Sequence, residues 1–130
     1  MISITSKSPY AIQALAELAS TADGGPVPIG EIARRRNVPV QFLEQLFAVL
    51  RRAGVLASQR GVKGGYRFAR DPRTVTVLEV VELLDGPLGQ GATGVFADAA
   101  AAARQVLEGC TIAEVVERET REAGASMYYI

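Results

Sequence analysis

Residues 41–66 read QFLEQLFAVLRRAGVLASQRGVKGGY and determine the fold. The first part has apolar residues at helical spacing and runs to Gly54, a residue type that commonly ends helices. A short apolar run follows, and then a glycine-rich turn that carries Arg60 and Lys63. A helix followed by a basic glycine-rich hairpin predicts a winged helix-turn-helix, in which the helix enters the major groove of DNA and the hairpin reaches the flanking backbone.

The residues before this stretch predict two further helices. Ser8 and Pro9 predict a helix start, with Ser8 as the N-cap and Pro9 at the first helical position. A short helix is expected over about 29–36, and the main helix over about 40–53. Gly54 supplies the C-cap of this main helix. Its predicted buried face consists of Phe42, Leu43, Leu46, Phe47 and Leu50.

The hairpin and its surroundings set the expected fold class. Two short strands are predicted near 55–59 and 65–69, around the glycine turn. The fold class is therefore mainly α (α+β), a winged helix-turn-helix with a two-stranded wing and a C-terminal dimerisation helix. We expect residues 1–76 to form the DNA-binding domain and residues 77–130 to form the dimerisation helices and a C-terminal tail.

Two capping boxes organise the second half. Thr76 with Glu79, and Thr111 with Glu114, have the spacing at which a Thr side chain caps a helix N-terminus. Gly124 is expected to stop the last helix and to leave a short apolar tail. A run of five alanines favours a helix between the two boxes. The predicted helices are 77–84, 95–107 and 112–123.

The charge distribution is consistent with a nucleic-acid partner, although the formal net charge is zero. Residues 1–76 hold 11 Lys or Arg and 5 Asp or Glu, whereas residues 77–130 hold 3 and 9. The basic half can bind phosphate alone, because salt screens charges beyond about 8 Å. The alternative is an ordinary solvated surface. No apolar run is long enough to span a membrane and no signal-peptide stretch is present, so a cytoplasmic protein is expected.

The composition argues against an enzyme and against a metal site. The chain has no histidine, which removes the commonest general base and the commonest metal ligand. One cysteine cannot hold a zinc ion or an iron–sulfur cluster without other ligands. We therefore expect no catalytic residues, no metal and no cofactor.

The residues expected to contact DNA lie on the main helix and the wing. At the start of the helix, Gln41, Glu44 and Gln45 lie off its apolar face. Gln can pair with adenine and Glu can accept from cytosine, so these residues are candidate base readers, with plain helix surface as the alternative. The remaining candidates suit phosphates or the minor groove; they are Lys7, Arg51, Arg52, Arg60 and Lys63.

The sequence resembles the Rrf2 family of bacterial transcriptional regulators. The resemblance covers about residues 2–87 and includes ITSKSPYAIQALAELA, FLEQLFAVLRRAGVL, the GGY wing and TVLEVVELLDGP. It implies a winged-helix homodimer on a palindromic operator, with base reading at Gln41 and Glu44 and a wing arginine at Arg60. Pro39, Phe42 and the wing sequence VKGG depart from common family residues, so the operator sequence cannot be copied across.

Many family members hold an iron–sulfur cluster through three cysteines before the long helix. The equivalent stretch here, about residues 86–99, contains none, so the chain resembles the cluster-free branch. Within that branch the end MYYI resembles the end of the cysteine metabolism repressor, which works with cysteine synthase (O-acetylserine sulfhydrylase). The resemblance implies a partner-binding tail of Tyr128, Tyr129 and Ile130, because a pocket can capture a terminal carboxylate beside an apolar side chain. The alternative is that the tail packs on the dimer.

Three functions stay open at this stage. The leading hypothesis is a DNA-binding repressor of cysteine or sulfur metabolism. The second is a redox-sensing regulator that uses Cys110, which precedes the Thr111 cap and could have an activated thiol there. A small buried residue at a helix junction is the alternative for Cys110. The third is a protein that only docks cysteine synthase through its tail, which the basic wing argues against.

Overall fold

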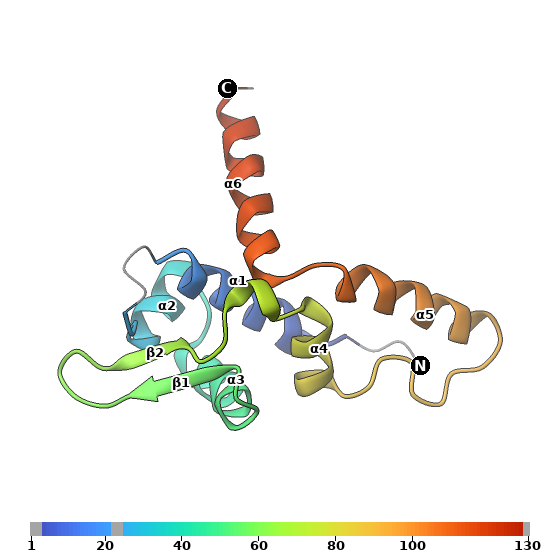
Figure 1. Cartoon of the computed structure of the whole chain (residues 1–130), viewed down its shortest axis with the longest axis horizontal. Coiled ribbons are helices and arrows are strands. Elements are labelled where there is room, and N and C mark those ends of the chain that lie inside the picture. The colour runs from blue at the N-terminus through green and yellow to red at the C-terminus, as the bar shows by residue number, and fades with distance from the viewer. Residues whose placement is uncertain (1–3, 22–24, 129–130) are drawn as a thin grey trace.

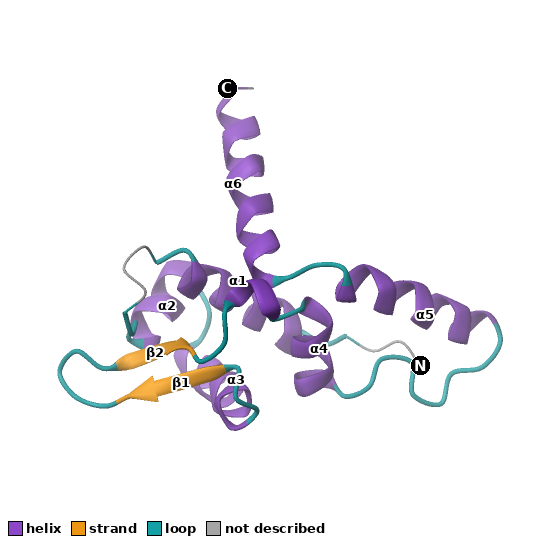
Figure 2. Ribbon diagram, in the orientation of Figure 1, coloured by secondary structure: helices purple, strands orange, loops and turns teal. Residues whose placement is uncertain are grey.

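The computed structural model describes residues 4–21 and 25–128, with the side chains of 125–128 left out of the description. It is mostly helical, with one two-stranded antiparallel sheet, and has the winged helix-turn-helix architecture (Figures 1 and 2). The predicted fold class is confirmed. The elements are α1 Lys7–Ala19, α2 Ile29–Arg36, α3 Val40–Arg52, β1 Leu56–Gln59, β2 Gly65–Phe68, the 3-10 helix η1 Pro72–Thr74, α4 Val77–Asp85, α5 Val95–Glu108 and α6 Ile112–Tyr128.

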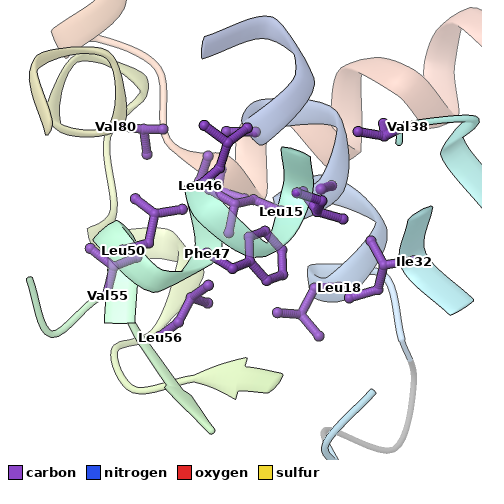
Figure 3. Close-up of a cluster of buried hydrophobic side chains, with 14 of the residues drawn as sticks. Leu15, Leu18, Ile32, Val38, Leu46, Phe47, Leu50, Val55, Leu56 and Val80 are labelled. Atoms are coloured by element: carbon purple, nitrogen blue, oxygen red, sulfur yellow. The ribbon is translucent and has the colours of Figure 1, made fainter. Parts of the chain in front are cut away.

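The core lies where α3 packs against α1, α2 and the sheet (Figure 3). Phe47 is fully buried and its ring meets Tyr66 of β2 edge to face, with centroids 5.1 Å apart. The predicted apolar face of α3 is confirmed, except that Phe42 at its margin is only half-buried. The core also includes Val80 of α4 and Ile112 of α6, so it continues across the domain boundary at residue 76, which stays a prediction.

The end of α3 has the form expected of a helix that stops at glycine. Gly54 has a φ of 82°, a left-handed conformation that suits glycine. Its N–H donates to the carbonyl of Arg51 at 3.0 Å, and the N–H of Val55 donates to the carbonyl of Leu50 at 3.0 Å. These two bonds satisfy carbonyls at the end of the helix and turn the chain directly into β1.

The wing is joined to the rest of the domain through Tyr66. The register pairs Leu56 with Phe68 and Gln59 with Gly65. On the other edge of β2, Tyr66 and Val27 exchange two backbone hydrogen bonds of 2.9 Å each. The hairpin is therefore supported by the rest of the domain. An isolated two-stranded hairpin would be only marginally stable in water.

The predicted start of α1 is wrong. The helix begins at Lys7 with Ser6 at the N-cap position, so Ser8 lies inside the first turn. Ser8 is buried, and its hydroxyl donates 2.5 Å to Asp85 at the end of α4 instead of capping α1. Pro9 sits in the third helical position, where its missing N–H still costs nothing because the first four N–H groups of a helix have no intrahelical partner.

The predicted end of α6 is also wrong. The helix does not stop at Gly124 but continues to Tyr128. Gly124 is not among the glycines with positive φ, so it takes the ordinary helical conformation. Alanine neighbours on both sides favour the helix enough to offset the roughly 1 kcal/mol that a glycine costs there. Tyr128 is therefore part of α6, whereas Tyr129 and Ile130 lie outside the described residues.

The two predicted caps of the second half are confirmed. Thr76 Oγ1 accepts from the N–H of Glu79 at 3.1 Å, and Thr111 Oγ1 accepts from the N–H of Glu114 at 3.2 Å. Thr76 and Thr111 also form an isolated bridge, which ties the start of α6 to the start of α4. From this junction α5 and α6 extend away in different directions (Figure 1). Within the described residues, no helix is long and apolar enough to cross a membrane.

Candidate nucleic-acid interface

Helix α3 presents a polar row opposite its buried face. Gln41, Glu44 and Gln45 are exposed, as the sequence predicts, while Leu43 and Leu46 on the other side are buried. The row lies at the N-terminal end of α3. At 1.5 Å per residue, Gln41 lies about 15 Å and Gln45 about 9 Å along the axis from Arg51 near the other end of the helix. An exposed polar row on a helix of this size can reach base edges in a major groove.

An aromatic pair supports the end of α3 that carries the exposed row of Gln41, Glu44 and Gln45. The ring of Phe42 meets the ring of Tyr10 edge to face, with centroids 5.7 Å apart. This contact joins the first turn of α3 to α1. It therefore fixes the end of α3 that carries Gln41 and Glu44.

The cations of the N-terminal half fall into two groups. Arg35, Arg36, Arg70 and Arg73 are each in an ion pair with a carboxylate. A second group is exposed and makes no ion pair with any described residue, so its charges are available to a phosphate backbone. This group consists of Lys7, Arg34, Arg51, Arg52, Arg60, Lys63 and Arg67.

Two members of the free group, Arg34 and Arg67, are missing from the sequence prediction. Arg34 belongs to the run of three arginines in α2, and only the structure shows that its neighbours form ion pairs while Arg34 forms none with a described residue. Arg67 lies between Tyr66 and Phe68 on β2, and strand alternation alone would have placed it on the outer face.

The tip of the wing is an exposed, tight glycine turn whose backbone another molecule can approach closely. Arg60, Val62 and Lys63 are all exposed, with Val62 fully so. The turn is closed by a 3.0 Å hydrogen bond from the N–H of Gly64 to the carbonyl of Gly61. A Cβ at Gly64 would lie 2.2 Å from the carbonyl oxygen of Gln59, so only glycine allows this turn.

Lys7 is placed by the start of α1. Its N–H donates 3.2 Å to Thr5 Oγ1, and the Thr5 hydroxyl donates 2.6 Å to Asp85. Burial works to raise the pKa of Asp85, but hydrogen bonds from Ser8 and Thr5 together hold this pKa below its ordinary value. A charged Asp85 thus anchors the N-terminus of α1, which carries Lys7.

The remaining predicted residues lie in the C-terminal half. Cys110 is half-buried between α5 and α6, and its thiol donates to the carbonyl of Thr111 at 3.7 Å. Tyr128 ends α6, which extends away from the wing (Figure 1). Cys110 and Tyr128 therefore belong to other parts of the fold than the predicted DNA contacts, which lie on α1, α3 and the wing.

Comparison with known proteins agrees with this architecture. Residues 4–118 match the model of the family Rrf2, described as an iron-dependent transcriptional regulator. The chain belongs to the Rrf2 family. Its relatives are named transcriptional regulators rather than enzymes. The regulator IscR of Aliivibrio salmonicida is 43% identical over 82 residues, which cover 63% of this chain and 49% of that protein. IscR of Escherichia coli O1:K1 is 39% identical over 82 residues, which cover 63% and 51%.

The likeness to solved structures covers more of the chain. The global cysteine regulator CymR of B. subtilis superposes with a TM-score of 0.83 at 28% identity, over 91% of this chain and 98% of that one. T. potens IscR superposes with a TM-score of 0.79 at 34% identity, over 91% and 88%. The chain spans about half the length of the IscR sequences it matches.

The family description names iron, but the residues of this chain do not fit a cluster held by cysteines. Cys110 is the single cysteine of the sequence, and the connection between α4 and α5, residues 86–94, has none. In the part of the chain that the structure describes, no three His, Cys, Asp or Glu side chains are grouped to hold a metal ion. No step of the proposed function therefore passes through iron.

Proposed function

We propose that this chain is a sequence-specific DNA-binding repressor that acts as a homodimer on a palindromic operator. The observation that carries the proposal is the exposed row Gln41, Glu44 and Gln45 on α3, flanked by exposed cations that form no ion pair with a described carboxylate. Membership of a family of transcriptional regulators supports it. A bound dimer would block transcription by occupying the promoter.

Each part of the interface has a distinct proposed role. The row on α3 reads bases, with Glu44 accepting from the amino group of cytosine and the glutamines pairing with adenine. Lys7, Arg51 and Arg52 bind phosphates and set the position of the helix without reading sequence. Arg60 and Lys63 reach the flanking backbone or minor groove from the wing, where the glycines allow close approach.

Helix α5 supplies a surface for the homodimer. It extends away from the body of the protein (Figure 1). Its sequence places exposed apolar residues at helical spacing in a stripe along one side. Val95 is 72% exposed and Val106 is 70% exposed, and the small residues Ala99 and Ala102 lie between them on the same stripe. Small residues allow two helices to approach closely, so a second copy of α5 fits this stripe.

Selection of bound sequences from a random DNA pool tests the proposal. A dimer with two recognition helices should select two inverted half-sites whose centres lie about one helical turn apart. Sedimentation of the complex should give two protein chains per duplex. A single half-site without inverted repetition, bound by a monomer, would contradict the proposal.

A role in cysteine or sulfur metabolism is the finer proposal. It is supported by the superposition on CymR, which is described as the global cysteine regulator of B. subtilis. The competing similarity to IscR means that the operators found by selection must decide the target genes. Sites upstream of genes for cysteine synthesis or uptake would favour the proposal, and their absence there would contradict it.

The two alternative signals depend on residues of the C-terminal half. A thiol switch at Cys110 predicts that peroxide weakens DNA binding in the native protein and not in Cys110→Ser. Docking of cysteine synthase through Tyr128, Tyr129 and Ile130 stays a prediction. Its test is a calorimetric titration of the enzyme with the intact chain and with a chain that lacks Tyr129 and Ile130. No heat with the intact chain would end this hypothesis.

A further inference from the structure

Arg36, the last residue of α2, is held between two other helices. Its Nε donates 2.8 Å to Glu17 of α1. Its two terminal nitrogens donate 2.8 and 3.0 Å to the two carboxylate oxygens of Glu119 on α6. All three side chains are partly shielded, and the Arg36 side chain is only 22% exposed. A guanidinium whose three nitrogens donate to two carboxylates is held in one orientation, because its planar geometry must match both partners.

The electrostatics of the site agree with the geometry. The hydrogen bond from Arg36 holds the pKa of Glu17 below its ordinary value, although burial works in the opposite direction. Glu119 and Glu17 in turn raise the pKa of Arg36. Arg36 therefore carries a permanent charge whose two partners lie 19 and 83 residues away in the chain.

Arg36 lies directly before the turn that leads from α2 into α3. The chain turns directly after it, with Asn37 in a left-handed conformation at φ 55° and ψ 47°, and then enters α3 at Val40. The N–H of Val38 donates to the carbonyl of Ala33 at 2.9 Å, so the turn is rigidly attached to α2. Gln41, the first proposed base reader, lies five residues after Arg36. A displacement of Arg36 therefore displaces the start of α3.

Helix α6 reaches α3 indirectly as well, because it packs on α1, and α1 contacts α3 through Tyr10 and Phe42. Its main contacts are with α1 and with the 3-10 helix that follows the wing. The ion pair with Glu119 thus joins α6 to the helix that immediately precedes the recognition helix.

We propose that Arg36 and Glu119 form a positioning link through which α6 sets the orientation of α3 on DNA. The inference rests on the proposed function. It makes α6 a part of the interface that reads DNA, since the ion pair between Glu119 and Arg36 links α6 directly to the helix that precedes α3. Neither Arg36 nor Glu119 touches DNA in this proposal; both act through α3.

The test compares Glu119→Gln with Glu122→Gln. Both variants remove one negative charge from α6, but the Glu122 side chain is exposed and makes no ion pair with a described residue. General electrostatics predicts that removal of a negative charge leaves DNA binding unchanged or strengthens it. The positioning link predicts the opposite sign for Glu119→Gln, a decrease of roughly three- to thirtyfold in affinity for the selected operator.

Three further readouts separate positioning from direct DNA binding and from unfolding. Affinity of Glu119→Gln for a scrambled duplex and the salt dependence of binding should both match the native protein, because every residue that binds phosphate is still present. Arg36→Lys keeps the charge but not the two-pronged geometry, and should lower operator affinity in the same direction. Operator affinity within twofold of native for Glu119→Gln, or an equal decrease for Glu122→Gln or for the scrambled duplex, would overturn the link.

Amide hydrogen exchange tests the link between Arg36 and Glu119 in the absence of DNA. In Glu119→Gln without DNA, the amides of Asn37 to Leu43 should exchange several-fold faster than in Glu122→Gln. Equal exchange rates in the two variants would overturn the link, whatever the chain does with DNA. Faster exchange without any specific DNA binding would retain the link and reject the proposed function.

Discussion

The rings of Tyr10 and Phe42 meet edge to face, with centroids 5.7 Å apart and planes at 89°. Tyr10 belongs to α1 and Phe42 to the first turn of α3, next to the proposed base reader Gln41. The pair thus anchors the reading end of α3 to the helix that carries Lys7. An edge-to-face pair is worth about 0.5–1.5 kcal/mol beyond the area that it buries.

We therefore expect Phe42→Ala to destabilise the protein by about 2 kcal/mol, less than the removal of a fully buried Phe ring, because this ring is half-buried. Denaturant unfolding of Tyr10→Ala, Phe42→Ala and the double variant measures the coupling between the rings. The coupling should be about 1 kcal/mol. Additive destabilisation by the two substitutions would show that the two rings pack independently.

A second prediction concerns the glycine where β2 meets Val27. Gly65 has a φ of 155°, and a Cβ there would lie 2.3 Å from the carbonyl carbon and oxygen of Val27. Gly65→Ala should therefore destabilise the protein by about 2–4 kcal/mol, because the clash is with backbone that cannot move without breaking the bridge to Tyr66. Thermal unfolding measures this destabilisation.

Gly124→Ala is the matched control, since it makes the same change inside α6. Gly124 has a helical conformation, and a Cβ there would meet no described atom within 4 Å outside the neighbouring backbone of α6. It should stabilise the protein by about 0.5–1 kcal/mol. Destabilisation by Gly124→Ala would mean that α6 does end at this residue, as the sequence alone suggests.

Local signals predict much of this fold. The face of α3 follows from apolar spacing, its end follows from Gly54, and both later caps follow from a Thr three residues before a Glu. Each of these depends on residues within one or two turns of one another. The exposed row on α3 is predicted for the same reason, because one helix fixes which residues share a face.

Contacts between distant residues are what the sequence does not predict. Ser8 is a residue type that commonly caps helices. In the structure its hydroxyl instead donates a hydrogen bond to Asp85, 77 residues later, and α1 begins earlier, at Lys7. The three arginines of α2 look alike in sequence. Only the tertiary structure pairs Arg36 with Glu119 and leaves Arg34 exposed without an ion pair to any described residue, so the division of the cations into ion-paired and unpaired groups requires the fold.

The third prediction concerns acid stability and rests on Asp85. Burial works to raise the pKa of Asp85, but hydrogen bonds from Ser8 and Thr5 hold it below its ordinary value. A folded pKa below the unfolded one stabilises the fold above about pH 4, and this stabilisation disappears as the pH falls through the folded pKa. Ser8→Ala should raise the pKa of Asp85, which a carboxyl-carbon NMR titration measures, and should move acid unfolding to higher pH.

Asp98→Asn is the control for this prediction. Asp98 is exposed on α5, and its side chain makes no hydrogen bond or ion pair with a described residue. Its removal should leave the acid transition in place, whereas Asp85→Asn should reduce the loss of stability below about pH 4, because Glu17 still has a lowered pKa and continues to contribute to that loss. If Asp85→Asn and Asp98→Asn unfold with the same pH profile, Asp85 is not the anchor of α1.

The last prediction separates a base reader from a phosphate-binding residue on one helix. Glu44→Ala should change which base is preferred at one or two operator positions, by about 1–3 kcal/mol for each base whose hydrogen bond to Glu44 is removed. Arg51→Ala should weaken binding to every sequence alike, and should reduce the slope of log affinity against log salt by about 0.9 for the phosphate released. Fluorescence anisotropy with all single-base variants of the selected operator, at several salt concentrations, measures both effects. Each variant is the control for the other, since both residues are exposed on α3 and lie about 10 Å apart along its axis. If both variants weaken binding equally across every base substitution, Glu44 binds no base, and reading must be assigned to Gln41 and Gln45.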